Sequence, residues 1–245
     1  MSRYSALAIH LGISLLIFLA LSAVIVLRWY PDYFFELDGG WEGLRLILGV
    51  DLVLGPLLTL IVFNAAKPEI KTDMAIIGAL QIARLAAGMY VVWSERPLAL
   101  VYVDGHFYSM SADAWTEVNQ PVPDLSGFPG DWPKRIAVEL PTGVNELSEI
   151  RGSAFLAGTS MRVQSDFYVP MAQSGVVLSD EYPLEKIRQR DQDYGELVEW
   201  QKRHPGSLED YAFFPLGTRY KYLFVGYRRE GLEYAGLLYL SLIHI

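Results

Sequence analysis

Three apolar stretches near the start of the chain constrain its fold most strongly. They cover residues 6–27, 44–63 and 74–93. Each is about as long as the ~20 residues that an α-helix needs to cross the ~30 Å hydrocarbon core of a bilayer. No further stretch of this kind occurs in residues 94–245. The sequence therefore predicts a membrane protein, with a three-helix transmembrane bundle in residues 1–93 and a water-soluble domain in residues 94–245.

The connections between these stretches predict the orientation in the membrane. The first connection, residues 28–43, carries four acidic residues and Arg28, whereas the second, residues 64–73, carries Lys67 and Lys71. Lysine and arginine concentrate in cytoplasmic connections, so the N-terminus and the second connection should be cytoplasmic. The first stretch is longer than the ~7–15-residue apolar core of a signal peptide, so we expect an uncleaved anchor. Residues 94–245 are then expected on the outer face, which is the periplasm for a bacterial inner membrane.

Charge and cysteine content exclude several classes of function. Residues 94–245 hold 14 basic and 21 acidic residues and account for most of the formal net charge of −8. Such an acidic domain argues against nucleic acid and anionic headgroups as its main ligands. The chain has no cysteine, which excludes a disulfide framework, a thiol nucleophile and a cysteine metal site.

Several polar residues fall at membrane depth: His10, Asp51 and Arg84, with Gln81 close to Arg84. A lone charge near the bilayer centre costs about 2.5–3.5 kcal/mol, so such residues usually face the bundle interior and find partners. Asp51 and Arg84 lie at similar depths in the second and third stretches, which predicts an ion pair between them. A structural lock between the two helices is the favoured interpretation, and a proton or ion relay is the alternative. We expect His10 to make a hydrogen bond in helix packing rather than to bind a ligand.

The second stretch also contains Gly55-Pro56. Proline inside a helix removes a backbone hydrogen bond and kinks the helix, and glycine lets a neighbouring helix approach closely. We interpret this pair as a packing kink, with a moving hinge as the alternative.

Residues 50–64, which read VDLVLGPLLTLIVFN, and the following Lys67-Pro68 closely resemble the signature of the type IV pilin accessory proteins of the TfpX/TfpZ kind. The segments Ile9–Leu15, Trp29–Pro31 and Arg96-Pro97 are similar to that family as well. The resemblance implies an inner-membrane accessory protein that helps pilin assembly or pilus dynamics. It implies no catalytic residues.

The sequence of residues 94–245 predicts a small α+β domain with an antiparallel sheet. Asp104-Gly105 is typical of a tight hairpin turn, and residues 120–133 are rich in proline and glycine, which predicts an exposed loop. The terminal segment Ser241–Ile245 either continues the last strand or is a truncated or non-native end. The expected strands are residues 98–103, 106–110, 134–140, 220–227 and 233–240, and the expected helices are residues 144–156 and 184–204.

Common catalytic and cofactor motifs are missing from the sequence. It has no phosphate-binding glycine loop, no His-Glu-x-x-His site and no Gly-x-Ser-x-Gly nucleophile elbow. We therefore expect no catalytic residues, no cofactor and no metal. The favoured function is a non-enzymatic accessory protein whose partners are the bilayer and type IV pilin or pilus assembly proteins. The alternatives are a periplasmic ligand sensor or transporter subunit, and a membrane-bound enzyme that modifies the envelope. In the favoured function, a pilin helix could pack against the second and third helices. Four small residues there would permit its close approach: Gly49, Gly55, Gly78 and Gly88.

Overall fold

The chain divides into two compact units, Met1–Arg96 and Pro97–Ile245. The structure, a computed structural model, describes residues 2–63, 68–174, 181–191 and 195–240. Each unit has its own core, and each is described by itself below. The elements of the first unit are α1 (Arg3–Val24), the π-helical segment η1 (Ile25–Trp29), α2 (Phe34–Leu37), α3 (Gly40–Ile47), the π-helical segment η2 (Leu48–Leu54), α4 (Gly55–Val62) and α5 (Ile70–Ser94).

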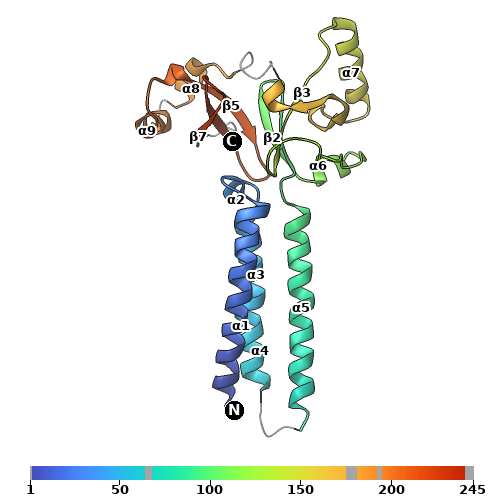
Figure 1. The fold of residues 1–245 in the computed structure, drawn as a ribbon, viewed down its shortest axis with the longest axis vertical. Helices are drawn as coiled ribbons and strands as arrows, with labels where there is room; N and C mark the ends of the chain where they lie inside the picture. The colour runs from blue at the N-terminus through green and yellow to red at the C-terminus, as the bar shows by residue number, and fades with distance from the viewer. Residues whose placement is uncertain (1, 64–67, 175–180, 192–194, 241–245) are drawn as a thin grey trace. The chain divides into compact units, whose positions relative to one another are not determined.

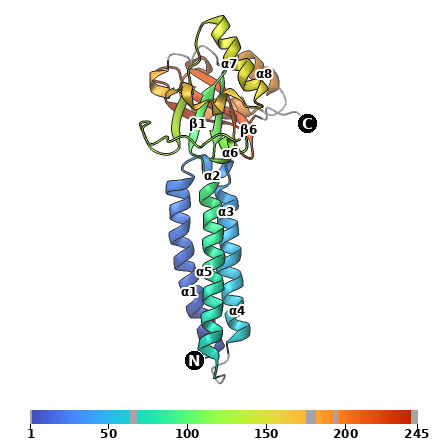
Figure 2. The same ribbon diagram turned by 90° about the vertical axis from the view of Figure 1, so that its right-hand side faces the viewer.

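Three long helical spans dominate the first unit (Figures 1 and 2). Within the described residues, the spans Arg3–Trp29, Gly40–Val62 and Ile70–Ser94 are long and apolar enough to cross a membrane. The predicted three apolar helices are thus confirmed, with ends that differ from the expected ones by one to four residues. The hydroxyl of Ser2 begins the first span by accepting a hydrogen bond from the Ser5 amide at 3.1 Å.

The middle span changes its helical type along its length. It begins as α3, continues as the π-helical η2 and ends as α4, in which Pro56 is the second residue. Pro56 has no amide hydrogen to donate to the carbonyl of Leu52, so the α-helical ladder must break there. A local π-helical adjustment is one way in which a membrane helix satisfies the backbone groups freed by proline. The structure thus has a π-helical segment directly before Gly55-Pro56, and the kink expected at this pair stays a prediction.

The three spans are tied together near one end of the unit. Ile25, Tyr30, Ile47 and Val92 form a buried cluster there. The Tyr30 hydroxyl donates a hydrogen bond to the Val92 carbonyl at 2.9 Å. A Cβ atom on Gly43 would lie 2.9 Å from Val92 Cγ2, so glycine is needed for α3 and α5 to approach this closely.

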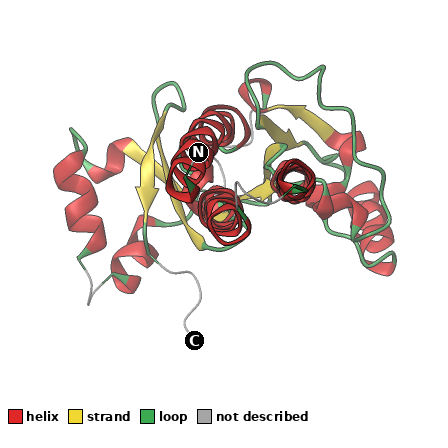
Figure 3. Cartoon of the chain, turned by 90° about the horizontal axis from the view of Figure 1, so that it is seen from below, coloured by secondary structure: helices red, strands yellow, loops and turns green. Residues whose placement is uncertain are grey.

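Away from this cluster, the spans are arranged around the middle one. α1 packs along α4 and η2, and α5 packs against α3, η2 and α4. Figure 3 shows the long helices of this unit from below, close to end-on. The middle span therefore links the first and third spans.

The second unit is built on a seven-stranded mixed sheet in the order β4-β3-β1-β2-β5-β6-β7. The pairs β1–β3 and β2–β5 are parallel, and the other neighbouring pairs are antiparallel. The prediction of an antiparallel sheet was therefore wrong for β1–β3 and β2–β5 and right for the other four pairs. The strands are β1 (Ala99–Val103), β2 (His106–Met110), β3 (Lys134–Val138), β4 (Tyr168–Pro170), β5 (Tyr211–Gly217), β6 (Tyr222–Arg228) and β7 (Tyr234–Leu238).

The hairpin expected around Asp104-Gly105 is confirmed. β1 and β2 are antiparallel, with Val103 opposite His106. Asp104 and Gly105 both have positive φ, 50° and 76°. Two consecutive residues of positive φ are the signature of the type I′ turn, which matches the twist of the strands that it joins.

The helix expected over residues 184–204 is divided in two. α8 ends at Arg190 and α9 begins at Glu196, after Gly195 with φ of 66°. Residues 192–194 lie outside the described residues. The expected helix over residues 144–156 is confirmed with the same bounds. The helices are α6 (Asp113–Thr116), α7 (Val144–Leu156), α8 (Leu184–Arg190) and α9 (Glu196–Arg203), with 3₁₀ turns η3 (Met161–Val163), η4 (Ser165–Phe167), η5 (Met171–Gln173) and η6 (Leu208–Asp210).

Two hydrophobic clusters cover different halves of this sheet. One centres on Trp115 and includes residues of β1, β3 and α7, and the other centres on Trp200 and includes residues of α8, β5 and β6. Both indole rings are fully buried. β3, β6 and β7 confirm the expected strands in those regions, and residues 120–133 form the expected loop. β4 and β5 were not predicted, and Ser241–Ile245 lies outside the described residues.

Candidate functional site

Five polar side chains from all three spans meet inside the first unit. α1 supplies His10 and Ser14, which are four residues apart and so share one helix face. The middle span supplies Asp51 and Thr59, and α5 supplies Gln81. Ser14 and Asp51 are 1% exposed and Thr59 is 3% exposed. We call these five residues the intramembrane polar cluster.

Gln81 forms the centre of the cluster. Its Nε2 donates to Asp51 Oδ1 and, at 3.3 Å, to Ser14 Oγ. The Ser14 hydroxyl also donates to Asp51 Oδ1 at 3.3 Å. Gln81 Oε1 lies 2.7 Å from His10 Nε2. An ionised carboxylate can only accept hydrogen bonds, so the amide nitrogen faces Asp51 and the amide oxygen faces His10. His10 Nε2 must then carry a hydrogen.

The other ring nitrogen of His10 faces the middle span. His10 Nδ1 lies 2.5 Å from Thr59 Oγ1, which is itself 3.2 Å from the Gly55 carbonyl. With a neutral imidazole, the Thr59 hydroxyl donates to Nδ1. With an imidazolium, Nδ1 donates to Thr59, and Thr59 donates to Gly55. His10 can therefore be satisfied in both protonation states by the rotation of one hydroxyl group.

The order of groups in the cluster helps to decide whether the intramembrane polar residues form a structural lock or a proton relay. Gln81 stands between His10 and Asp51, the two titratable members. A carboxamide is neither an acid nor a base at ordinary pH, so it does not readily pass a proton between them. The arrangement favours a lock that holds three helices in register over a proton relay.

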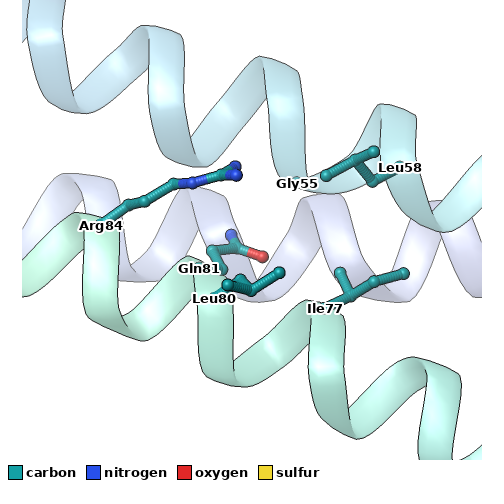
Figure 4. A pocket seen from close by; sticks show the side chains of 6 residues that line it. All are labelled: Gly55, Leu58, Ile77, Leu80, Gln81 and Arg84. Carbon is teal, nitrogen blue, oxygen red and sulfur yellow. The ribbon is translucent and has the colours of Figure 1, made fainter.

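Gly55 provides the space that Gln81 occupies. A Cβ atom on Gly55 would lie 2.6 Å from both Nε2 and Oε1 of Gln81. Figure 4 shows Gln81 extending from α5 toward the middle span near Gly55. Any larger residue at position 55 would push α5 away or displace the carboxamide. Pro56, the next residue, is buried at the start of α4.

Arg84 is not part of the cluster. Asp51 takes Gln81 and Ser14 as hydrogen-bond partners, and among the described residues it makes no ion pair with Arg84, contrary to the prediction. Arg84 is exposed and lines a small hollow with Gly55 and Leu58 (Figure 4). Arg84 follows Gln81 by three residues, which places it about 4.5 Å further along α5 and about 60° around the helix. Of these two side chains on α5, Gln81 is the one that contacts Asp51.

Sequence reasoning missed Ser14 and Thr59 as members of the cluster. Each carries a small hydroxyl group that is common in apolar helices. The available signal was spacing. Ser14 follows His10 by four residues and Thr59 follows Asp51 by eight, so each pair shares a helix face.

An apolar groove of about 410 Å³ opens beside the cluster, between α1 and α5. Asp51, Thr59 and Phe63 line it from the side of the middle span, and the other cluster members line it from α1 and α5. Its walls are one face of α1 and one face of α5. The wall residues, apart from cluster members, are Ala6, Ile9, Ile13 and Ile17 on α1 and Met74, Ile77, Gly78, Ile82 and Leu85 on α5.

The two histidines described in the second unit have local contacts. His204 stacks on Trp200 with ring centroids 3.8 Å apart, and its Nε2 lies 2.7 Å from the Ala235 carbonyl. His106 lies on β2, where its Nδ1 is 2.9 Å from the Asp104 carbonyl. No group of three or more His, Asp or Glu side chains in the described part of the chain is placed to share a metal ion.

Comparison with known proteins finds relatives from Dichelobacter nodosus. The chain is 33% identical over 125 residues to "Fimbrial assembly protein, serogroup E1", covering 49% of each chain. It is 31% identical over 125 residues to the serogroup I protein of the same name, again covering 49% of each. The chain therefore spans about half the length of these two curated relatives.

A third relative is covered more fully. The chain is 34% identical over 96 residues to "Fimbrial assembly protein, serogroups C1 and C2" from the same organism, which covers 38% of this chain and 73% of the relative. No family model matches the chain. No solved structure matches it either.

Proposed function

The chain belongs to the family of the fimbrial assembly proteins, and from this membership we propose that it is a membrane-embedded accessory protein of type IV pilus assembly. The similarity to the fimbrial assembly proteins is the observation that carries the proposal. The resemblance of residues 50–64 to the TfpX/TfpZ accessory proteins supports the more specific assignment. We include an effect on pilus dynamics in the same proposal.

The proposed location is the bacterial inner membrane, with the N-terminus in the cytoplasm and residues 97–245 in the periplasm. The three apolar spans support a membrane location. The distribution of lysine and arginine in the connections supports this orientation. In this arrangement the protein meets pilin, or pilus assembly proteins, both in the bilayer and outside it.

The proposed role is non-enzymatic. The intramembrane polar cluster supports it, because its hydrogen bonds join three helices to one another. A scaffold of this kind can present a fixed surface to a partner in the bilayer. The protein would thereby act by binding and positioning a pilus subunit.

Deletion of the gene in its own bacterium tests the proposal. We expect less pilin in the sheared surface fraction while total cellular pilin stays constant, because assembly rather than synthesis is affected. A copy of the gene supplied in trans should restore surface pilin. The intact protein, purified in mild detergent, should retain pilin. Unchanged surface pilin together with no retained pilin would contradict the proposal.

A further inference from the structure

The α1/α5 groove is long enough to lie along several turns of a helix. Its wall on α1 runs from Ala6 to Ile17, and its wall on α5 runs from Met74 to Leu85. At about 1.5 Å per residue, each wall is about 16 Å long, or three helical turns. The groove therefore accepts a rod-shaped apolar group that lies parallel to the spans.

One buried atom beside the groove lacks a partner. Asp51 lines the groove and is 1% exposed, and its Oδ2 has no hydrogen-bond partner among the described residues. Both hydrogen-bond partners of its carboxylate, Ser14 and Gln81, use Oδ1. A buried, unsatisfied carboxylate oxygen is costly in an apolar medium. An occupant that brings a hydrogen-bond donor to this depth would remove that cost.

Gly78 leaves the groove open at its α5 wall. A Cβ atom built on Gly78 would meet nothing within 4 Å. In membranes, glycine at such a position lets the backbone of a neighbouring helix approach closely. Gly78 differs in this respect from Gly55, whose space is already filled by Gln81.

We propose that the α1/α5 groove binds the transmembrane helix of a pilus subunit, with a donor side chain of that helix hydrogen-bonded to Asp51. The donor is a hydroxyl, an amide or an ammonium group. This inference rests on the proposed function for the identity of the partner. It adds the surface, the depth and the chemistry of the contact.

The polar side of the groove favours a helix over a lipid. An acyl chain fills an apolar groove but has no hydrogen-bond donor, so it would leave Asp51 Oδ2 unsatisfied. A transmembrane helix satisfies its own backbone and can carry a donor side chain into the bilayer. A second copy of this chain is a further conceivable occupant, and the test below identifies it by mass.

Photocrosslinking from a single cysteine tests the inference in the intact protein in its native membrane. The chain has no cysteine, so one introduced residue can be labelled uniquely with benzophenone maleimide. Ile13→Cys places the probe in the groove, and Leu16→Cys is the matched control on α1 outside it. The native side chains at these positions are 54% and 70% exposed. We expect a pilin adduct from position 13 and little from position 16.

Two second-site variants test the groove itself. Gly78→Leu adds a side chain to the groove wall at a position where a Cβ atom meets nothing within 4 Å, and it should lower the adduct yield about tenfold, as overpacking of a contact does. Gly12→Leu is the matched control, because a Cβ atom there also meets nothing within 4 Å and Gly12 does not line the groove. Asp51→Asn keeps an acceptor for Ser14 and Gln81 but replaces Oδ2 by a donor. It should also lower the yield, whereas Gly12→Leu should not.

The outcomes separate this inference from the proposed function. Equal yields of pilin adduct from positions 13 and 16 would contradict the groove as the binding site. A yield that Gly78→Leu leaves unchanged would contradict it as well. Adducts only with lipid, with a second copy of the chain or with another protein would overturn the choice of occupant. If pilin still co-purifies in those cases, the proposed function stands. If pilin neither co-purifies nor forms adducts and surface pilin is normal in the deletion strain, both proposals fail.

Discussion

Gln81 connects all three membrane-spanning segments through a single carboxamide. It bonds Ser14 and His10 on α1 and Asp51 on the middle span. Removal of the carboxamide would take its Gln81 partner from His10 Nε2 and leave Ser14 and Asp51 bonded to each other, at about 1–3 kcal/mol for a polar group left unsatisfied. We expect Gln81→Leu to lower the unfolding temperature of the protein in detergent, measured by the loss of helical circular dichroism.

Arg84→Leu is the control for Gln81→Leu. Arg84 is exposed on α5, and no ion pair joins it to Asp51 in the described part of the chain. Its replacement should leave the unfolding temperature unchanged or raise it, because a charge leaves the apolar spans. If Arg84→Leu lowered the unfolding temperature and Gln81→Leu did not, Arg84 rather than Gln81 would be the partner of Asp51.

The same residues show how far sequence reasoning could reach in the membrane. Composition and spacing were sufficient to predict that Asp51 needs a partner on the third helix at the same depth. They could not choose between Gln81 and Arg84, which differ by one helical turn. Formal charge favoured Arg84, but the choice depends on rotation of α5 about its axis. In the structure, Val92 and Gln81 lie on the face of α5 that approaches Gly43 and Gly55 of the middle span.

Tyr227 gives the second unit a measurable response to alkali. Its hydroxyl is buried and has no hydrogen-bond partner among the described residues. Burial raises the pKa of Tyr227 to about 12, opposed by Arg135 and assisted by Tyr234. The unfolded pKa is about 10, so the folded state holds this proton more tightly. The associated stability is fully present below pH 10 and is lost as the pH rises toward 12, by up to about 3 kcal/mol.

Tyr227→Phe isolates this contribution. Phenylalanine removes an unsatisfied buried hydroxyl and keeps the ring, so stability at pH 8 should be unchanged or higher. Between pH 10 and 12 the variant should lose less stability than the wild-type protein, in urea titrations followed by tryptophan fluorescence. Parallel loss in the two proteins would contradict the raised pKa.

At the scale of single elements, Asp191 fixes the start of α9. Its Oδ1 accepts from the Glu196 amide at 2.9 Å and its Oδ2 accepts from the Leu197 amide at 2.8 Å. The carboxylate thus satisfies two of the free amides at a helix N-terminus. We expect Asp191→Ala to lower the free energy of unfolding by about 1–2 kcal/mol, and Asp191→Asn, with one remaining acceptor oxygen, by less. Equal stability of all three proteins in urea titrations would contradict this cap.

Gly226 allows α9 to pack on the sheet. A Cβ atom there would lie 3.0 Å from Trp200 Cζ2 and 3.2 Å from Phe213 Cε1. Gly226→Ala should therefore lower the free energy of unfolding by about 1–3 kcal/mol through overpacking. Gly152→Ala in α7 is the control, because its Cβ would meet nothing within 4 Å. It should raise stability by up to about 1 kcal/mol through helix propensity. A stabilising effect of both would refute the packing argument.

Local signals predicted the elements of the second unit better than they predicted their pairing. The Asp104-Gly105 turn and the helix over residues 144–156 follow from residues that are adjacent in sequence. β5 was missed because it contains Pro215, which argues against a strand. Proline is tolerated there because only Leu216 and Gly217 pair with β2. The parallel pairs β1–β3 and β2–β5 join distant segments, which periodicity cannot reveal.

At the scale of the whole molecule, the chain combines a unit of apolar helices with a unit built on a sheet, and sequence patterns predict the fold of the first better than that of the second. The length and hydropathy of three stretches were enough to predict the first unit, because only helices of that length satisfy their backbone in a bilayer. The groove between α1 and α5 could not be predicted, since it depends on how both helices pack on the middle span. The mixed topology of the sheet was likewise beyond the sequence patterns.

The proposed contacts with pilin require that three crossings separate the N-terminus from residues 97–245. Fusions of alkaline phosphatase and of a fluorescent protein after Leu240 test this directly, with matched fusions in the connection between the second and third spans. We predict phosphatase activity and no fluorescence after Leu240, and the opposite pattern in the connection. Bright fluorescence with an inactive phosphatase after Leu240 would contradict the account.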